Sequence, residues 1–334
     1  MSCPREKRER AEHYIIGPYG LLSENSRGRL TPEDECCIRT CFQRDIDRIT
    51  HSKSFRRLKH KTQVFLQPEG DHYRTRLTHT LEVSRLARTV ARALALNEDL
   101  AEAIALGHDL GHTPFGHAGE RALAKIYPGG FKHYEQSLRV VDILERDGRG
   151  LNLCYETRMG ILHHTHGAPD DTPEAVAVRL CDRIAYVNHD LDDSIRAGIL
   201  TDADVPELIR KNCGERNSER INSILTDLIE NSAGGVLKMS DRMQKTFDFF
   251  HVFMYSDVYT NPRAKSEESK VEGILSRLYD YYTAHPDALP EDFRGIIEHE
   301  GTERAATDYI SGMTDGYAME KYGELFIPFA WTVK

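Results

Sequence analysis

The sequence of 334 residues lacks any run of about 18 consecutive apolar residues, which is the minimum for a membrane-spanning helix. It also has few alternating apolar and polar stretches of the kind that form strands, and no internal repeat or low-complexity tract. Apolar residues instead recur mainly three and four positions apart, which predicts an all-α protein. The N-terminus carries charges with no apolar stretch behind them, so we expect no signal peptide.

Cysteine is sparse, with seven residues in the chain and no Cys-x-x-Cys spacing. We therefore interpret the cysteines as reduced thiols of a cytoplasmic protein, and expect no all-cysteine zinc site. A net charge of −9 and a pI near 6.0 argue against a general binder of nucleic acids or membranes. With 40% hydrophobic residues, the chain has enough apolar side chains for a substantial core.

The length and the helical pattern predict a peripheral arm at residues 1–30 followed by one helical domain at 31–334. Within this domain we expect a core at 50–200 and a helical C-terminal region at 201–334. Apolar spacing predicts helices at about 76–96, 98–108, 114–126, 133–146, 155–164, 173–197, 204–211, 216–232, 240–254, 265–284, 290–297 and 302–322.

Two local signals precede these helices. The capping sequence Thr31-Pro32-Glu33-Asp34 predicts the start of a helix over 34–60 that becomes basic toward its end. The sequence Pro68-Glu69-Gly70-Asp71 predicts a turn joining two short strands, which would make one small hairpin.

The dipeptide His108-Asp109 is the most informative feature, with His79 upstream and the helical carboxylate Asp182 downstream. Two imidazoles and two carboxylates form a mixed nitrogen and oxygen set, which suits a divalent cation open to water and phosphate. Helical spacing turns His79 and His108 inward with the apolar faces of their helices. Asp182 lies on a polar stripe that faces either solvent or a polar cleft. A lone histidine is more often a core residue bonded to a carbonyl, so the metal site depends on all four groups converging.

A second group of histidines follows directly. Thr113-Pro114 predicts a new helix, on which His117 and Glu120 are three residues apart and share a face. With His112 and His133, these residues could supply an acid or base beside a metal-bound water. Alternatively, they belong to one enlarged metal site or cap helices. We expect the glycines of this stretch to mark backbone that passes close to a ligand: Gly107, Gly111, Gly116 and Gly119.

Residues 51–76 are rich in lysine and arginine and contain only two acidic residues, Glu69 and Asp71. A basic segment in an acidic chain suits a small polyanion, although a charge run is usually a solvated surface. Arg76, three residues before His79, is expected to hold a phosphate near the metal, and Arg74 is not.

Several ordered motifs, among them Arg76-Leu77-Thr78-His79 and His108-Asp109-Leu110-Gly111-His112, carry a family resemblance. Together with segments 44–49, 54–65, 113–120, 182–190 and 308–315, they resemble the deoxyguanosine triphosphate triphosphohydrolase family of HD-domain metal-dependent phosphohydrolases. The resemblance covers most of the chain. It implies an HD-domain helical fold with an extended helical C-terminal region, and hydrolysis of deoxynucleoside triphosphates to deoxynucleoside and triphosphate.

The resemblance also implies roles for individual residues. The divalent metal (manganese, magnesium, cobalt, nickel, iron or zinc) would be bound by His79, His108, Asp109 and Asp182. The positions linked to catalysis are His117 and Glu120, and those that line the phosphate cleft are His112 and His133.

The substrate-binding positions follow from the same resemblance. Arg76 and Arg183 would hold phosphates, and Gln63 would contact the sugar 3′-hydroxyl. Tyr186 would pack on the deoxyribose, and Asp190 would face the sugar or phosphate region. The residues that contact the base do not carry over.

Other readings stay open at this point. The chain could be another HD-type phosphohydrolase, acting on a nucleoside monophosphate or a signalling nucleotide, or a nucleotide sensor without turnover. The basic residues at 53–61 favour a triphosphate. The family resemblance further implies a homo-oligomer, and an activating nucleotide as in some members. The run His163-His164-Thr165-His166 is either a peripheral metal site or a polar helix end.

Overall fold

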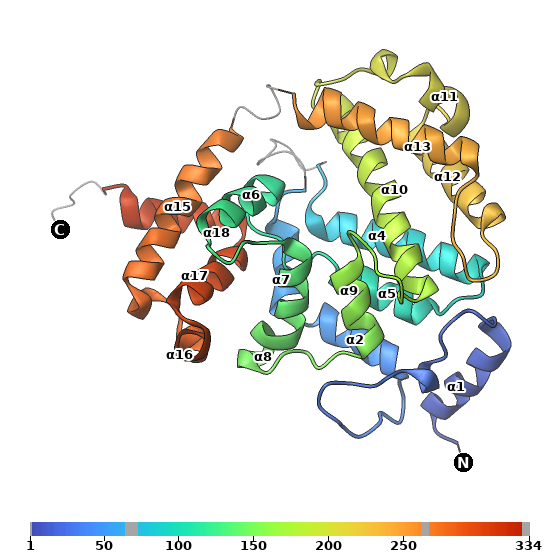
Figure 1. Ribbon diagram of the computed structural model, residues 1–334, viewed down its shortest axis with the longest axis horizontal. Helices are drawn as coiled ribbons and strands as arrows, with labels where there is room; N and C mark the ends of the chain where they lie inside the picture. Colours follow the sequence, from blue (N-terminus) through green and yellow to red (C-terminus); the bar gives the residue numbers. More distant parts are fainter. Residues whose placement is uncertain (1, 64–72, 262–266, 329–334) are drawn as a thin grey trace, which may run out of the picture.

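The computed structural model describes residues 2–63, 73–261 and 267–328 (Figure 1). Within these ranges the regular elements are helices, and strand-like pairing is limited to isolated bridges. The prediction of an all-α protein is therefore confirmed. One bridge joins Thr62 to Thr75 at the base of the expected hairpin, but the turn at 68–71 lies outside the described residues. No helix in the described ranges combines the length and the apolar character that a membrane crossing needs.

The largest group of buried apolar residues, the first core, lies among five helices. They are α4 (Arg76–Ala93), α5 (Glu98–Gly107), α10 (Pro173–Arg196), α12 (Asn217–Asn231) and α13 (Asp241–Met254). Local signals place two of their N-termini. The side chain of Asn97 accepts hydrogen bonds from the first backbone N–H groups of α5, and Thr172 caps α10 directly before Pro173. Helices α4 and α10 carry two of the four expected metal ligands, and α5 ends directly before the other two.

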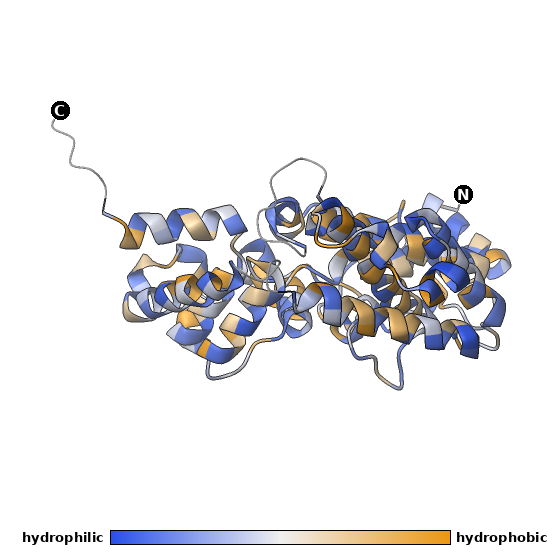
Figure 2. Ribbon diagram, turned by 90° about the horizontal axis from the view of Figure 1, so that it is seen from above, coloured by the Kyte–Doolittle hydropathy of each residue, from blue (hydrophilic) through white to orange (hydrophobic). Residues whose placement is uncertain are grey.

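A second core lies at the other end of the molecule, where the C-terminal helices pack around α6 (Figure 1). Its helices are α6 (Gly116–Ile126), α15 (Glu268–Ala284), α16 (Arg294–Glu300), α17 (Thr302–Ser311) and α18 (Asp315–Phe326). Seen from above in Figure 2, this group and the N-terminus lie at opposite ends of an elongated molecule.

A third core joins these two groups. It is formed by α2 (Cys41–Thr50), α9 (Tyr155–His163) and the π-helical turn Val140–Leu144 that follows α7 (His133–Arg139). Smaller helices border it or pack outside it: α1 (Pro4–Ile15), α3 (Lys53–Arg57), α8 (Glu145–Gly148) and α11 (Glu207–Cys213).

The contact between α5 and α9 depends on two glycines that face isoleucines. A Cβ atom on Gly107 would stand 2.4 Å from the Cδ1 atom of Ile161, and one on Gly160 would stand 2.4 Å from the Cδ1 atom of Ile104. On each helix, the glycine thus leaves space that an isoleucine side chain of the other helix fills. The two helices can approach closely only because both glycines are present.

Two expected helices are wrong. Residues 31–40 are irregular, and the segment predicted as one helix over 34–60 contains α2 and α3, since Thr40 and Ser52 each cap a new helix with a side-chain oxygen. The expected helix at 302–322 is also two, α17 and α18, because Thr314 caps α18 in the same way.

Candidate active site

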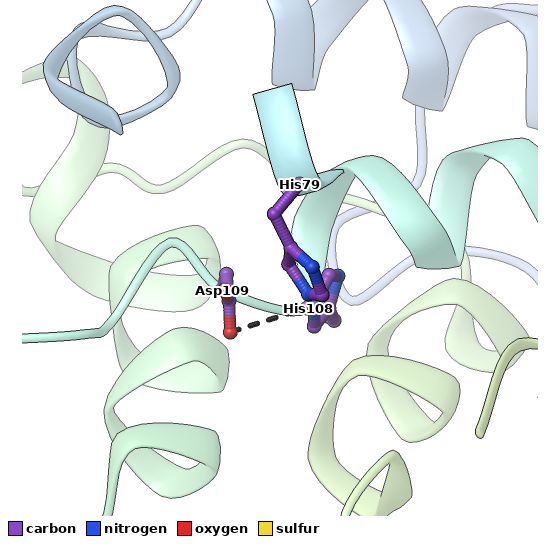
Figure 3. A group of neighbouring side chains, drawn as sticks. All are labelled: His79, His108 and Asp109. Carbon is purple, nitrogen blue, oxygen red and sulfur yellow. Dashed lines mark ion pairs between the residues drawn. The ribbon is translucent and has the colours of Figure 1, made fainter. Parts of the chain in front are cut away.

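The four expected metal ligands converge in the structure. His79 lies in the first turn of α4, His108 directly follows α5, and Asp182 lies on α10. The Nε2 atom of His79 lies 3.0 Å from Oδ1 of Asp182, and Nε2 of His108 lies 3.7 Å from that oxygen. Nε2 of His108 also lies 3.5 Å from Oδ1 of Asp109 (Figure 3). The polar stripe that carries Asp182 therefore faces a cleft rather than open solvent.

Hydrogen bonds orient these groups for a cation. The Nδ1–H group of His108 donates to the carbonyl oxygen of Ala105 at 2.6 Å, so Nε2 carries the lone pair, and this buried atom has no hydrogen-bond partner. The guanidinium of Arg76 donates to Oδ2 of Asp109 at 2.8 Å, which leaves Oδ1 directed toward the imidazoles. Ligands at about 2.1 Å from one cation stand about 3.0–3.4 Å apart. One ligand atom each of His79, His108 and Asp109 lies within 4.8 Å of the others, and Asp182 contacts both imidazoles, so the group is a candidate site for a divalent cation.

Electrostatics keep both carboxylates ionised. Burial acts to raise the pKa of Asp182, but the hydrogen bond with His79 and the proximity of His108 outweigh it and lower the pKa to about 2. Burial likewise opposes ionisation of Asp109, yet His108 and Arg76 hold its pKa well below the usual range. A pair of ionised carboxylates between two imidazoles is the donor chemistry of a divalent cation site.

The second histidine group forms a chain of contacts. Nδ1 of His117 lies 3.4 Å from one carboxylate oxygen of Glu120, and the other oxygen accepts from the backbone N–H of His133 at 2.8 Å. The same oxygen lies 2.9 Å from Nδ1 of His133, whose Nε2 lies 3.2 Å from Nε2 of His164. Despite its burial, Glu120 has a lowered pKa because of the hydrogen bonds from His117 and His133.

Two of the histidines are held neutral. Burial lowers the pKa of His112 well below its usual value, and the charge of Arg76 adds to the effect. The ring of His112 stacks on that of His133 with centroids 4.0 Å apart. Burial, together with His108 and His133, lowers the pKa of His164 to about 3.

The run at 163–166 does not form one site. Among its three histidines only His164 lies in the cleft, where its ring centroid is 5.0 Å from that of His108. His163 pairs with Asp171 at 2.7 Å, and the ring of His166 stands against Tyr134.

The cleft beside the ligand group has a volume of about 300 Å³. Gln63, Arg76, Arg183 and Tyr186 all line it. The Oε1 atom of Gln63 and the Nε and Nη2 atoms of Arg76 are buried without a hydrogen-bond partner, which makes them available to a ligand. Asp190 does not line this cleft in the described part of the chain.

Asp190 instead lies behind the cleft wall. It is fully buried, and its Oδ2 atom accepts a hydrogen bond of 2.6 Å from the hydroxyl of Tyr259, whose ring stacks on Tyr186. Burial raises the pKa of Asp190 well above the usual range, although the bond from Tyr259 opposes this. The position expected to face the sugar therefore contacts a tyrosine.

Three residues near the site escaped the sequence prediction as site residues. His251 of α13 lines the cleft, and its Nε2 atom is buried without a partner. Tyr259 stacks on Tyr186, and His189 stands edge-on to His79 with centroids 6.0 Å apart. The available signal for His251 was its place four residues after the buried Phe247 on a mainly apolar helix.

Gly111 and Gly119 serve packing within the protein, whereas a Cβ atom on Gly116, whose φ is +56°, would stand 3.4 Å from Nη2 of Arg76 at the cleft. A Cβ atom on Gly111 would stand 2.1 Å from the backbone nitrogen of Ser137, and one on Gly119 would stand 2.0 Å from the carbonyl oxygen of Pro114. Gly111 therefore seats the turn after His108 directly on α7.

The basic segment is divided among several roles. Arg76 reaches the cleft, whereas Arg74 pairs with Glu82 and Asp193 at 3.1 and 2.9 Å. Phosphate binding by Arg76 rather than Arg74 stays a prediction. Lys61 is buried, so it cannot contribute to a positive surface.

Comparison with known proteins adds a sequence relationship to this geometry. A family model described as "HD domain" matches residues 76–187, which include all four ligand candidates, and a "Phosphohydrolase-associated domain" model matches residues 237–324. A deoxyguanosinetriphosphate triphosphohydrolase-like protein of Caldanaerobacter subterraneus subsp. tengcongensis is 51% identical, over 98% of this chain and 97% of the relative. One of Desulfatibacillum aliphaticivorans is 47% identical, over 97% of this chain and 98% of the relative. The chain belongs to the dGTPase-like family of HD-domain proteins.

Solved structures are more distant from this dGTPase-like protein. A phosphohydrolase of Bacteroides thetaiotaomicron aligns with a TM-score of 0.48 and 18% identity, over 84% of this chain and 69% of that structure. A hypothetical protein of Aquifex aeolicus aligns with a TM-score of 0.47 and 20% identity, over 85% of this chain and 68% of that structure.

Proposed function

We propose that this dGTPase-like protein is a metal-dependent hydrolase that converts a deoxynucleoside triphosphate to the deoxynucleoside and triphosphate. The observation that carries the proposal is the cleft in which a His79, His108, Asp109 and Asp182 ligand set adjoins the His117–Glu120 pair. Such a cleft brings a cation site, phosphate-binding arginines and a proton donor within reach of one small molecule.

The proposed cation site has two imidazole nitrogens and two carboxylate oxygens. A bound divalent metal would polarise a phosphoryl oxygen and acidify a water molecule. Manganese, magnesium, cobalt, nickel, iron and zinc all accept such mixed donors, so the choice among them depends in part on supply.

The arginines of the cleft would bind the phosphate groups. Arg76 is held by Asp109 through Nη1, so its remaining N–H groups point in a fixed direction. Arg183 is exposed at the cleft and carries no ion pair to a described carboxylate. Guanidinium groups suit phosphates because they donate two parallel hydrogen bonds.

His133 would border the same region. One nitrogen of His133 contacts Nε2 of His164, which accepts because Nδ1–H of His164 donates to Ile161. The other nitrogen contacts a carboxylate oxygen of Glu120, which also accepts. These contacts hold the ring of His133 in a fixed orientation at the cleft.

His117 would transfer the proton that completes hydrolysis. As water adds to the α-phosphorus, the bond to the 5′-oxygen breaks, and His117 protonates that oxygen as the nucleoside leaves. Glu120 orients the ring, because its carboxylate contacts Nδ1 of His117 and leaves Nε2 for the substrate.

Sugar recognition would involve two further parts of the cleft. Gln63, with its free Oε1 atom, would accept from the 3′-hydroxyl, and the ring of Tyr186 would pack on the deoxyribose. Asp190 would act through Tyr259, which it holds against Tyr186. The division into an arm at 1–30 and a domain at 31–334, the homo-oligomer, the activating nucleotide and the cytoplasmic location stay predictions.

The test is a product assay with each of the four deoxynucleoside triphosphates, singly and in mixtures, with manganese or magnesium. We expect deoxynucleoside and triphosphate in equal amounts, and mixtures would reveal activation of one substrate by another. Monophosphate with pyrophosphate would contradict the proposal. Nucleotide binding without any product would indicate a sensor, and activity on monophosphates alone would indicate another HD-type hydrolase.

A further inference from the structure

A second cavity lies behind the turn that carries Asp109 and His112. Its volume is about 490 Å³, against about 300 Å³ for the active-site cleft, and Gly111 forms part of its wall. Its lining comes from α3, the π-helical turn after α7, α8, and the segment from residue 290 to α18. The cavity therefore lies between the second and the third core. Its size is in the range of small-molecule sites, about 300–1,000 Å³.

One part of this cavity is apolar. Its lining includes the aliphatic side chains of Val140, Leu144 and Ile296 and the ring of Phe293. Tyr309 also lines it and donates to or accepts from Tyr317 through its hydroxyl at 2.9 Å. A flat apolar body would remove water from these surfaces, which favours binding.

The cavity also encloses the guanidinium of Arg57, which is linked to the carboxylate of Glu145 only through the hydroxyl of Ser54. Arg57 lines it and donates from Nη2 to the hydroxyl of Ser54 at 2.9 Å, and its Nε atom is buried without a partner. No ion pair joins Arg57 to a carboxylate in the described ranges. Binding of an anion would therefore stabilise this half-buried guanidinium.

The acidic groups at this cavity are already engaged or exposed. Glu145 accepts from the backbone N–H and the hydroxyl of Ser54, at 2.7 and 2.6 Å, and from the backbone N–H of Lys53 at 3.1 Å. Asp308 is bonded to two arginines, and Asp292 is exposed to solvent. The ammonium group of Lys53 is itself mostly exposed, so Arg57 is the cation that the cavity encloses.

We propose that this cavity is a second ligand-binding site, which takes a small aromatic molecule with one anionic group. The anionic group would bind Arg57, and the ring would lie against Phe293 and the neighbouring aliphatic side chains. The site is separate from the active-site cleft, and its occupation does not depend on the proposed hydrolytic activity.

The test is a fluorescence titration of the metal-loaded full chain with 8-anilinonaphthalene-1-sulfonate, an aromatic dye with a single sulfonate. We expect saturable binding to one site. Arg57→Met should weaken the affinity by about ten-fold or more, because a charge-assisted hydrogen bond is lost. Ile296→Trp, which keeps Arg57 and fills the apolar part, should weaken it as well.

The matched control is Arg183→Met, which removes an arginine from the active-site cleft and should leave dye affinity unchanged. Equal affinity in the wild type and Arg57→Met, or a loss in Arg183→Met, would overturn the proposal. Wild-type crystals soaked in the dye supply a measurement that needs no variant. Density for the dye beside Arg57 is expected, and density elsewhere with this cavity empty would also overturn it.

Discussion

The carboxylate of Asp315 accepts a hydrogen bond of 2.8 Å from the backbone N–H of Phe115, although 200 residues separate the two. Its other oxygen accepts from the backbone N–H of Thr62 at 3.0 Å and from the hydroxyl of that residue. Phe115 has a φ of +63° and directly precedes α6, which carries His117. One side chain of the C-terminal region thus fixes two segments of the active-site cleft.

Asp315→Asn should lower both stability and turnover. An amide has one accepting oxygen, so either Phe115 or Thr62 loses its partner, and we expect a loss of about 1–3 kcal/mol in the free energy of unfolding. Displacement of α6 should lower kcat about ten-fold by moving His117 away from the substrate. Urea unfolding and steady-state assays would measure the two effects, with the exposed Glu320→Gln on the same helix as control. A destabilised variant with normal kcat would limit Asp315 to a structural role.

Removal of a metal ligand should remove the metal. His108→Ala and Asp182→Ala each leave three donors for the metal. After dialysis, we expect each variant to retain only a small fraction of one metal ion per chain and to be inactive. Mass spectrometry of bound metals would measure this. His163→Ala, whose histidine pairs with Asp171 outside the cleft, should retain the wild-type content. A chelator should abolish wild-type activity, and added manganese should restore it.

His117→Ala should affect chemistry more than binding. Loss of a general acid lowers turnover by about 10²–10⁴-fold, while the arginines of the cleft keep the affinity for nucleotide within a few-fold. Single-turnover rates and equilibrium binding of a non-hydrolysable nucleotide analogue would separate the two quantities. Equal losses in both would show that His117 binds substrate and transfers no proton.

Acid should destabilise the fold in part through His251. Burial and the charge of Arg183 lower the pKa of this histidine to about 4, against about 6.5 in an unfolded chain. Between these values the unfolded chain binds a proton that the folded protein does not, so stability falls as pH falls through this window. His251→Phe removes that difference, and the slope of unfolding free energy against pH should decrease by up to about 1.4 kcal/mol per pH unit. Urea titrations from pH 4 to 7.5 would measure it, and an unchanged slope in His251→Phe would contradict the prediction.

Local sequence signals predicted the part of the fold that carries the ligands. Apolar spacing and the caps at Asn97 and Thr172 define α5 and α10 whatever surrounds them, and inward spacing placed His79 and His108 on core faces. The same kind of signal was missed at Ser52 and Thr314, so two pairs of helices were each predicted as one. Caps decide such breaks, and an apolar pattern that continues across them conceals them.

The remainder of the site depends on contacts between distant segments. Nothing local to α10 indicates whether Asp182 faces solvent, because this is decided by the imidazoles of α4 and α5 that stand opposite it. His251 and Tyr259 lie outside the sequence segments that carried the family resemblance, and the bond from Tyr259 to Asp190 joins residues 69 positions apart. The family resemblance supplied roles for the motif residues, and it could not supply these pairings.

The reciprocal fit of Gly107 with Ile161 and of Gly160 with Ile104 has a consequence for the histidines nearby. Because each isoleucine packs against the glycine of the opposite helix, α5 and α9 cannot slide along each other. His108 and His164 lie just beyond the ends of these two helices. The spacing of these two histidines is therefore set by the packing of two isoleucine side chains against two glycines, with no polar side chain at the contact. A methyl group added at either glycine would be tolerated only if the isoleucine opposite were shortened at the same time. Among related sequences, residue 107 should therefore vary together with residue 161, and residue 160 with residue 104.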